Sequence, residues 1–262
     1  MQIKDITDVI EASAPLSLQE PYDNSGLIVG HHDDEVTSAL LCVDVTEEVL
    51  DEAESLGSEL VISHHPIIFD PLKRLTGANH VQRIVERAIK KGIALYACHT
   101  NLDGVKDGMS YRLAEQLGIK ELSVLSPGLP DGSGNGFGII GSLTKEMPTA
   151  AFIRDMKERL DLKVVRHSDI ARKDVRLVAL CTGSGASLIE TAASAGADIY
   201  IAADFKYNDF LRADGRLTVC DIGHFESEYC AIELLHDIIT KKLTTFALHK
   251  SAKSRNPVNY TV

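Results

Sequence analysis

The chain has 262 residues, of which 44% are hydrophobic and 25% are charged. These are ordinary values for a globular protein, and they exclude disorder as the main state of the chain. The 38 acidic residues outnumber the 27 basic ones and give a formal net charge of -11 at pH 7, which argues against direct nucleic-acid binding because such a field repels phosphate backbones.

The N-terminal residues 1–18 lack the basic start and the unbroken apolar stretch of a secretory signal peptide. The apolar runs elsewhere are far shorter than a membrane span. We therefore expect a cytoplasmic protein with no membrane segment. The five cysteines are odd in number and form no C-x-x-C pair, so we interpret them as buried, reduced thiols without a chemical role.

Short β-rich runs alternate with helical patterns along the chain. This alternation predicts an α/β fold with mostly parallel sheets. The expected strands are 40–45, 60–63, 93–98, 137–143, 175–181, 199–202 and 217–221. The expected helices are 47–56, 81–91, 108–117, 149–160, 187–195 and 226–241. Segment 126–138 contains five Gly and two Pro, which is typical of a linker or hinge between two units.

An internal repeat is found when the chain is compared with itself. An offset of 139 aligns residues 40–65 with 179–204 without a gap, and six positions are identical, among them Gly57 and Gly196. Both copies read as strand, turn, helix, Gly and strand, which indicates two related half-domains. The alternative is the general likeness of any two βαβ units. The pair of histidines that ends the first copy is replaced by Ala-Asp in the second.

Three segments concentrate side chains that bind metals, and each lies where an expected parallel strand ends. Ligands of open α/β sheets bind at this carboxyl edge, so we expect the three segments to meet at one sheet edge. The segments contain His64 with His65, His99 with Asp103, and His224 with Glu228.

The spacing within these segments has a physical interpretation. Neighbouring side chains of a strand point to opposite faces, so His64 and His65 converge only where the following proline ends the strand. Because two adjacent imidazoles would crowd one ion, we expect them to serve different ions. His224 and Glu228 are four residues apart and would face the same side of a helix that Gly223 opens.

The number of ligands indicates a dinuclear centre. Three imidazoles and two carboxylates are too many for one ion and too few to saturate two, which leaves room for water or substrate. A carboxylate such as that of Asp103 can bridge two ions. Mixed imidazole and carboxylate ligands suit two divalent ions of Zn, Mn, Fe or Ni. The predicted metal ligands are His64, His65, Asp103, His224 and Glu228.

At these residues the sequence resembles the Nif-three-like dinuclear metal family, also known as the GTP cyclohydrolase I type II family. Tyr22 departs from the family pattern, which often has Trp at this position. The motifs that carry the resemblance are PYDNSGLIVG at 21–30, VISHHPIIF at 61–69, CHTNLDGVKDGMS at 98–110, CTGSGAS at 181–187, GHFESE at 223–228 and NPV at 256–258.

The resemblance implies a fold of two similar, interlocked α/β half-domains, the first completed by the C-terminal segment. The implied ranges are 1–125 plus 218–262 for a metal-binding domain and 126–217 for a second domain. It also implies a homohexameric ring whose metal sites face an inner cavity, and it matches the same five ligands.

The function implied by the resemblance is that of a dinuclear metal-dependent hydrolase. The substrate would be a nucleotide or a related small molecule, with GTP cyclohydrolase activity, ring opening and formate release, as the first hypothesis. A metal-dependent phosphoesterase is the alternative enzyme. A ring that stores metal or binds a partner protein is the alternative without catalysis.

Roles other than binding the metal are considered for His99 and for two further segments. His99 is assigned a catalytic role in proton transfer, and support of a ligand carboxylate is the equal alternative. The segment 182–185 precedes a helix and could present N–H groups to an anion, although a tight turn explains it as well. Residues 24–26 fit ordinary turn chemistry, and the matched motif places them at the border of the site.

Overall fold

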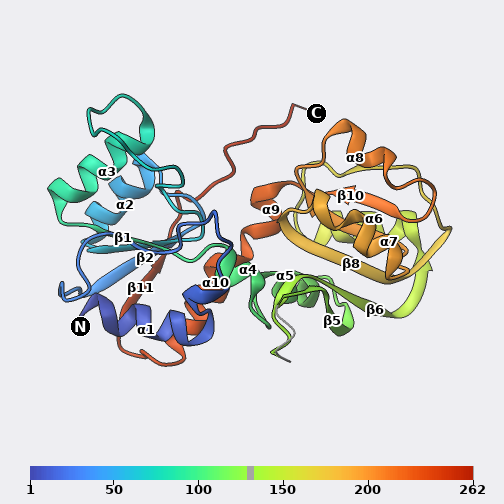
Figure 1. Ribbon diagram of the computed structural model, residues 1–262, viewed down its shortest axis with the longest axis horizontal. Coiled ribbons are helices and arrows are strands. Elements are labelled where there is room, and N and C mark those ends of the chain that lie inside the picture. The colour runs from blue at the N-terminus through green and yellow to red at the C-terminus, as the bar shows by residue number, and fades with distance from the viewer. Residues whose placement is uncertain (129–132, 262) are drawn as a thin grey trace. The chain divides into compact units, whose positions relative to one another are not determined.

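The computed structural model describes residues 1–128 and 133–261 (Figure 1). The chain divides into two compact units. Unit 1 consists of Met1–Leu102 and Ala231–Arg255, and unit 2 consists of Asp103–Cys230 and the segment from Asn256 onwards. The domain ranges implied by the resemblance stay a prediction. The described helices include none that is both long and apolar enough to cross a membrane.

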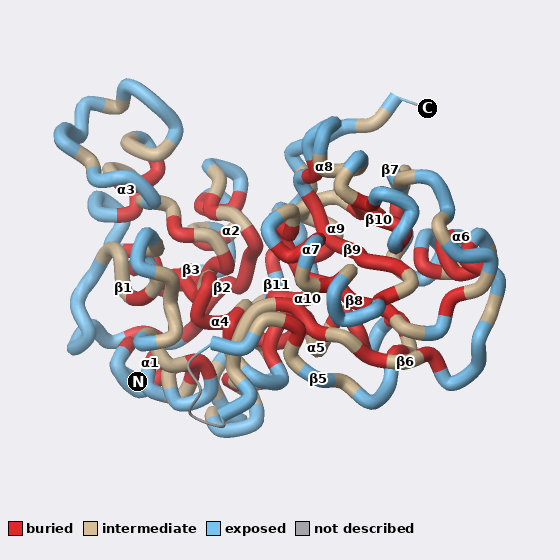
Figure 2. Tube along the Cα trace, turned by 45° about the vertical axis from the view of Figure 1, so that its right-hand side comes forward, coloured by how far each residue is buried: buried red, intermediate tan, exposed pale blue. Residues whose placement is uncertain are grey.

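Unit 1 is built on a five-stranded sheet in the order β1-β4-β3-β2-β11. All its neighbouring strands are parallel except β1 and β4. The three inner strands β2, β3 and β4 are buried along their whole length, as Figure 2 shows for β2 and β3. The strands are β1 (Gly26–Val29), β2 (Ser38–Cys42), β3 (Leu60–Ser63), β4 (Ala94–Ala97) and β11 (Ala247–Lys250).

Helices cover both faces of this sheet, with α2 and α3 on one face and α1 and α10 on the other (Figure 1). The side chain of Thr46 accepts the N–H of Val49 and starts α2, and Gly57 ends it at a φ of 68°. The helices of unit 1 are α1 (Ile3–Ser13), α2 (Glu47–Leu56), α3 (His80–Lys91) and a short 3-10 helix (Leu16–Leu18). The division between the units falls inside α4 (Thr100–Gly104) and inside α10 (Cys230–Thr240).

Unit 2 contains a six-stranded sheet in the order β5-β6-β8-β9-β10-β7. Its central strands β8, β9 and β10 are parallel and the outer pairs are antiparallel. Over both sheets, five of the nine described strand pairs are parallel, in agreement with the predicted α/β class. The strands are β5 (Lys120–Pro127), β6 (Gly136–Pro148), β7 (Arg166–His167), β8 (Asp174–Ser184), β9 (Ile199–Ala203) and β10 (Thr218–Asp221).

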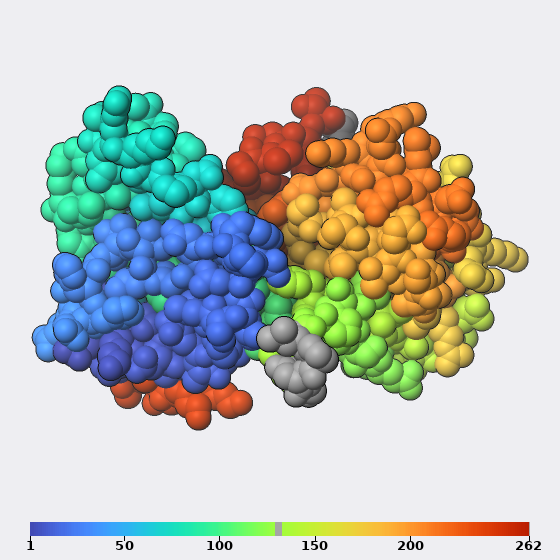
Figure 3. All heavy atoms as spheres, viewed as in Figure 1, coloured from blue at the N-terminus to red at the C-terminus, as the bar shows by residue number. Residues whose placement is uncertain are grey.

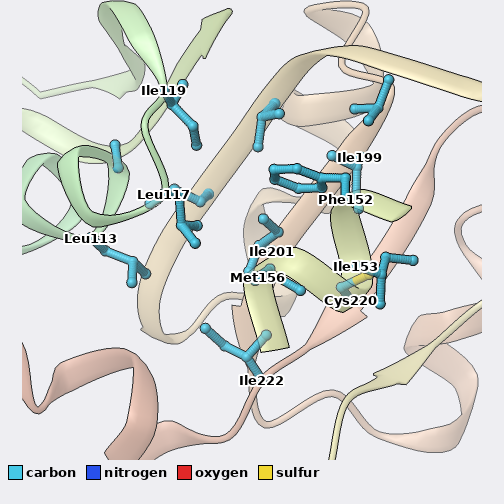
Figure 4. Close-up of a cluster of buried hydrophobic side chains, with 14 of the residues drawn as sticks. Leu113, Leu117, Ile119, Phe152, Ile153, Met156, Ile199, Ile201, Cys220 and Ile222 are labelled. Atoms are coloured by element: carbon cyan, nitrogen blue, oxygen red, sulfur yellow. The ribbon is translucent and has the colours of Figure 1, made fainter. Parts of the chain in front are cut away.

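Alternate residues of these central strands form two separate cores. Ile199 and Ile201 of β9 pack with α5 and α6 on one face (Figure 4). Tyr200 and Ala202 point to the opposite face and pack with α7, as the period of two in a strand requires. The helices of unit 2 are α5 (Met109–Gln116), α6 (Thr149–Arg159), α7 (Ile189–Ser194), α8 (Tyr207–Leu211), α9 (His224–Glu228) and a short 3-10 helix (Ala186–Leu188).

The Gly- and Pro-rich segment 126–138 is not a linker between units. Its ends belong to β5 and β6, which are paired from Pro127 and Gly136 inward, and Gly128 donates its N–H to the carbonyl of Asn135 at 3.0 Å. Residues 129–132 of the predicted linker lie outside the described residues. The prediction of a hinge here is wrong because Gly and Pro also dominate the turns of β-hairpins. The five cysteines are all buried and free, as predicted.

The internal repeat is confirmed by the pairing of the strands. Ala39 of β2 pairs with Leu60 of β3, and Val178 of β8 pairs with Ile199 of β9. These two pairs are related by the same offset of 139 that aligns the sequences. The two copies therefore share a strand register as well as a sequence pattern.

An acidic side chain at equivalent positions fixes the first strand of each copy. Glu59 accepts the backbone N–H groups of Thr37 and Ser38 at 3.1 and 3.2 Å, at the start of β2. Asp198, the aligned residue, accepts two N–H groups at the start of β8 at 3.0 and 2.8 Å. Burial raises the pKa of Glu59, but these hydrogen bonds outweigh it and bring the pKa below its ordinary value of 4.5.

The substitution Glu59→Gln should lower the free energy of unfolding at pH 7 by about 1–2 kcal/mol, because it removes a charged acceptor of several hydrogen bonds. A carboxylate with a lowered pKa stabilises the folded state fully above its unfolded pKa and loses this effect as the pH falls through the folded pKa. The difference between wild type and variant in urea unfolding should therefore shrink below about pH 4.5. Glu158→Gln, on the exposed surface of α6, is the control. An equal difference at every pH would contradict the assignment.

Candidate metal centre

His64 and His65 lie directly after β3, where the strand pairing ends. Their N–H groups still bond to the carbonyls of Cys42 and Val43, at 3.1 and 3.0 Å, so the backbone stays aligned with β2 up to this point. The two ring centroids are 4.9 Å apart. The prediction that the imidazoles converge at the end of the strand is confirmed.

His99 follows β4 and joins this pair. Its ring centroid lies 5.3 Å from that of His64 and 5.4 Å from that of His65. One nitrogen of each ring lies within 4.8 Å of the other two, which is close enough for the three to hold a metal ion. His64 and His65 thus lie close enough together to share one ion despite being adjacent in the sequence. Their assignment to different ions stays a prediction.

Nδ1 of each of these three rings is hydrogen-bonded to a different oxygen atom. Carbonyl and ionised carboxylate oxygens only accept hydrogen bonds, so a neutral ring carries its proton on Nδ1 and presents the lone pair of Nε2. This is the usual arrangement of histidines that bind metals. The bonds are His64 to the carbonyl of Cys98 at 2.9 Å, His65 to Asp44 at 2.8 Å and His99 to Asp23 at 2.6 Å.

Asp23 is the most extensively bonded of these anchors. Its side chain is fully buried and also accepts the N–H and the hydroxyl of Thr100 and the hydroxyl of Ser25. Burial raises the pKa of Asp23, but the bonds from His99 and Thr100 lower it to well below its usual range, so the carboxylate stays ionised. Asp23 lies inside the PYDNSG motif but was not among the predicted site residues, because no spacing rule links it to His99.

In unit 2, His224 and Glu228 occupy the first and last positions of α9. Gly223 precedes the helix at a φ of 90°, and Nε2 of His224 lies 2.9 Å from Oε2 of Glu228, as their spacing predicts. Nδ1 of His224 is held by Asp204 at 2.7 Å. Burial lowers the pKa of His224, but the bonds to Glu228 and Asp204 raise it to about 9. Glu226, two residues after His224, instead accepts the side-chain N–H of Asn256 at 2.8 Å and so points elsewhere.

Asp103 lies in α4 and is the remaining predicted ligand. Its Oδ1 accepts the hydroxyl of Thr182, at 3.4 Å, at the end of β8. Cys181 is buried beside Asp103 and Glu228; burial first, and then these two charges, raise the pKa of its thiol to about 12. This thiol is therefore neutral at physiological pH, in agreement with its assignment as a structural residue.

The segment 182–185 does not present free N–H groups to an anion. Gly183 donates its N–H to the hydroxyl of Ser227 at 2.9 Å, and Gly185 donates to the carbonyl of Ala203 at 3.3 Å. A Cβ atom at Gly183 would collide with Oε1 of Glu228. The glycine therefore makes room for the Glu228 carboxylate, and the N–H groups of both glycines are used within the fold, in agreement with the alternative of a tight turn.

The three segments do not all follow strands of the same sheet, so the expectation of a single sheet edge is wrong. His64, His65 and His99 follow strands of the first sheet, whereas His224 follows β10, which pairs with β9 in the second sheet. The physical reason is the repeat, because its second copy builds a sheet of its own and β10 extends that sheet.

The side chains present fit divalent metal ions. Four imidazoles have Nδ1 bonded to an oxygen atom, and carboxylates of Asp103 and Glu228 accompany them in the sequence segments. Imidazole nitrogen and carboxylate oxygen are the ligands that Zn, Mn, Fe and Ni share. Histidine and carboxylate groups of this chain can thus bind metal, and three of the imidazoles already form such a group within unit 1.

Known proteins resemble this chain over its whole length. The family model Duf34/NIF3 (NGG1p interacting factor 3) matches residues 1–257. A GTP cyclohydrolase 1 type 2 homolog of Clostridium perfringens is 34% identical over 259 residues, which cover 97% of this chain and 98% of that protein. A homolog of the same name from Campylobacter jejuni is 31% identical over 265 residues, which cover 99% and 100%.

Solved structures agree with this relationship. The Bacillus cereus protein related to NIF3 superimposes with a TM-score of 0.90 at 25% identity and covers 100% of this chain and 99% of its own. A hypothetical protein of Staphylococcus aureus gives a TM-score of 0.90 at 28% identity with the same coverage. These likenesses confirm the fold class of two α/β half-domains that the sequence predicts. The chain belongs to the Duf34/NIF3 family.

Proposed function

We propose that this protein is a metal-dependent hydrolase of a nucleotide, with GTP as the first candidate, and that it works with two divalent ions. The proposed ligands are His64, His65, Asp103, His224 and Glu228. The proposal is carried by the hydrogen bonds that join Nδ1 of His64, His65 and His224 to oxygen atoms. Each of these bonds prepares Nε2 of its ring for a metal. When bound, such ions supply a Lewis acid and a water of lowered pKa.

The two sets of side chains complement each other. Unit 1 contributes imidazoles, and unit 2 contributes the carboxylates of Asp103 and Glu228, which balance the charge of divalent ions. The chain itself links the sets, because Asp103 follows His99 by four residues at the start of α4. A helical rise of 1.5 Å per residue sets these positions about 6 Å apart along the chain.

The names of the relatives support a guanine nucleotide as substrate. Several proteins that match nearly the whole chain are named GTP cyclohydrolase 1 type 2 homolog. In the proposed reaction, water adds at C8 of guanine and the C8–N9 bond breaks, which leaves a formamide on N7. A second water hydrolyses the formamide to formate and the free amine.

His99 is proposed to move a proton in this reaction. Its Nδ1 is fixed by Asp23, whose carboxylate stays ionised because its pKa lies well below its usual range. Nε2 is thus prepared to take a proton from water and to release it to the departing ring nitrogen. Holding a metal together with His64 and His65 is the alternative use of the same nitrogen. The homohexameric ring implied by the resemblance and the cytoplasmic location expected from the sequence stay predictions.

The variant His99→Ala separates these roles when metal content and turnover are measured on the same preparation. If His99 transfers protons, turnover should fall about 100-fold or more while the metal content stays at the wild-type value. Loss of metal together with turnover would contradict the proton-transfer role and would assign His99 to the metal. His167→Ala, an exposed histidine of β7, is the matched control and should change neither quantity.

The reaction itself is tested with GTP, other nucleotides and a generic phosphoester in the presence of Mn or Zn. We expect formate from GTP, and no formate from Asp103→Ala. Asp107→Ala, an exposed aspartate of the same segment, serves as the control. Phosphate release without formate would contradict the ring-opening reaction and favour a phosphoesterase. Metal binding without turnover of any substrate would contradict the enzyme proposal as a whole.

A further inference from the structure

Two aromatic side chains stand exposed beside the imidazoles of unit 1. Tyr22 is 64% exposed and Phe69 is 47% exposed. Their ring centroids lie 6.3 Å apart, and the ring of Phe69 lies 6.2 Å from the imidazole of His99, almost perpendicular to it at 78°. Tyr22 and Phe69, which we call the aromatic pair, therefore border the group that contains His99.

Hydrogen bonds fix the segments that carry the aromatic pair. Asn24 donates its side-chain N–H to the carbonyl of Ile68 at 2.7 Å and so ties the segment of Tyr22 to that of Phe69. Asp23 ties the same segment to His99, as described above. The N–H of Ser25 bonds to the side chain of Gln19 at 3.0 Å. Asp23 and Asn24 thus fix the backbone next to Tyr22 relative to His99 and to the segment of Phe69.

Both rings leave a large part of their apolar surface exposed. Burial of apolar surface is favourable by about 25 cal/mol per Å², so two exposed neighbouring rings give up stabilisation that a buried position would supply. The segment that carries Phe69 lies at the surface of unit 1 between β3 and α3 (Figure 3). Rigid, exposed aromatic rings next to a reactive group are typical of surfaces on which a planar ligand stacks.

We propose that the aromatic pair binds the base of the substrate by stacking, which places a purine rather than a phosphate chain next to His99. The inference rests on the proposed function and extends it by naming the part of the nucleotide that unit 1 recognises. Aromatic faces attract the planar base and offer nothing to a phosphate group. The position of the base beside an imidazole favours chemistry on the purine ring over hydrolysis of a phosphoester.

The absence of tryptophan from the chain gives a direct test of binding. Tyr22→Trp introduces a single indole into the aromatic pair, and a stacked purine should quench its fluorescence. Guanosine and GTP should both quench it, whereas inorganic triphosphate should not. Ile89→Trp, at an exposed position of α3, is the control and should not respond to guanosine. Equal responses of the two tryptophans, or a response to triphosphate alone, would overturn the proposal.

A second set of variants tests the same pair without a label. Stacking of one base contributes about 1–3 kcal/mol, so Phe69→Ala should weaken guanosine binding about 5- to 150-fold. The KM for GTP should rise accordingly while the metal content stays unchanged. Tyr22→Phe, which keeps the ring, should bind like the wild type. Phe69→Ala with wild-type guanosine affinity would overturn the proposal.

The two proposals can fail separately. If guanosine quenches Tyr22→Trp while no nucleotide is hydrolysed, base binding stands and the proposed hydrolysis is wrong. If the wild type hydrolyses GTP and Phe69→Ala does so with the same KM, hydrolysis stands and base binding by the aromatic pair is wrong.

Discussion

The hydrogen bond from Nδ1 of each histidine to an oxygen atom is the interaction on which the rest of this structure depends. It fixes the tautomer and the orientation of the ring at once, so that Nε2 is available to a metal. The acceptors differ: a backbone carbonyl holds His64, and buried or partly exposed aspartates hold the other rings. Such bonds form in the fold itself, and the chain can therefore prepare the ligands before any ion binds.

The internal repeat explains how one chain supplies two kinds of ligand. The offset of 139 places Asp204 at the position of His65. In the first copy this position carries an imidazole, and in the second it carries the aspartate that holds His224. Asp204 has a φ of 59°, a left-handed conformation that Asp tolerates better than most residues. The same scaffold thus contributes a proposed ligand in one half and a support for a proposed ligand in the other.

Local signals predicted much of the fold. The limits of α2 and β3 agree with the expected ranges, because a capping Thr, a left-handed Gly57 and a short apolar run mark them. The alternation of strand and helix patterns did not predict α1. The residues of α1 were compared only with the features of a signal peptide. The same patterns also omitted β1 and β11, the four-residue strands at the two edges of the first sheet. The Gly and Pro content of segment 126–138 was interpreted as a linker, although its described ends belong to the paired strands β5 and β6.

The site was predictable where residues adjacent in sequence act together and unpredictable where distant ones meet. The pair His224 and Glu228 follows from helix geometry alone. Asp23, in contrast, reaches His99 across 76 positions, and Asp44 reaches His65 across 21, distances over which no spacing rule operates. The placement of the ligand segments on two sheets likewise depends on which strands pair, and the strand pattern does not specify this.

The central claim is that oxygen-anchored imidazoles hold a pair of ions, and metal analysis at equilibrium with a divalent ion tests it most directly. The account predicts two ions per chain for the wild type. It also predicts affinity about 10- to 100-fold weaker for Asp204→Asn, which removes the charge of an anchor. Asp214→Asn, an exposed aspartate that is also left-handed, at a φ of 45°, should bind like the wild type. At most one ion per chain, or an Asp204→Asn variant with unchanged affinity, would contradict the account.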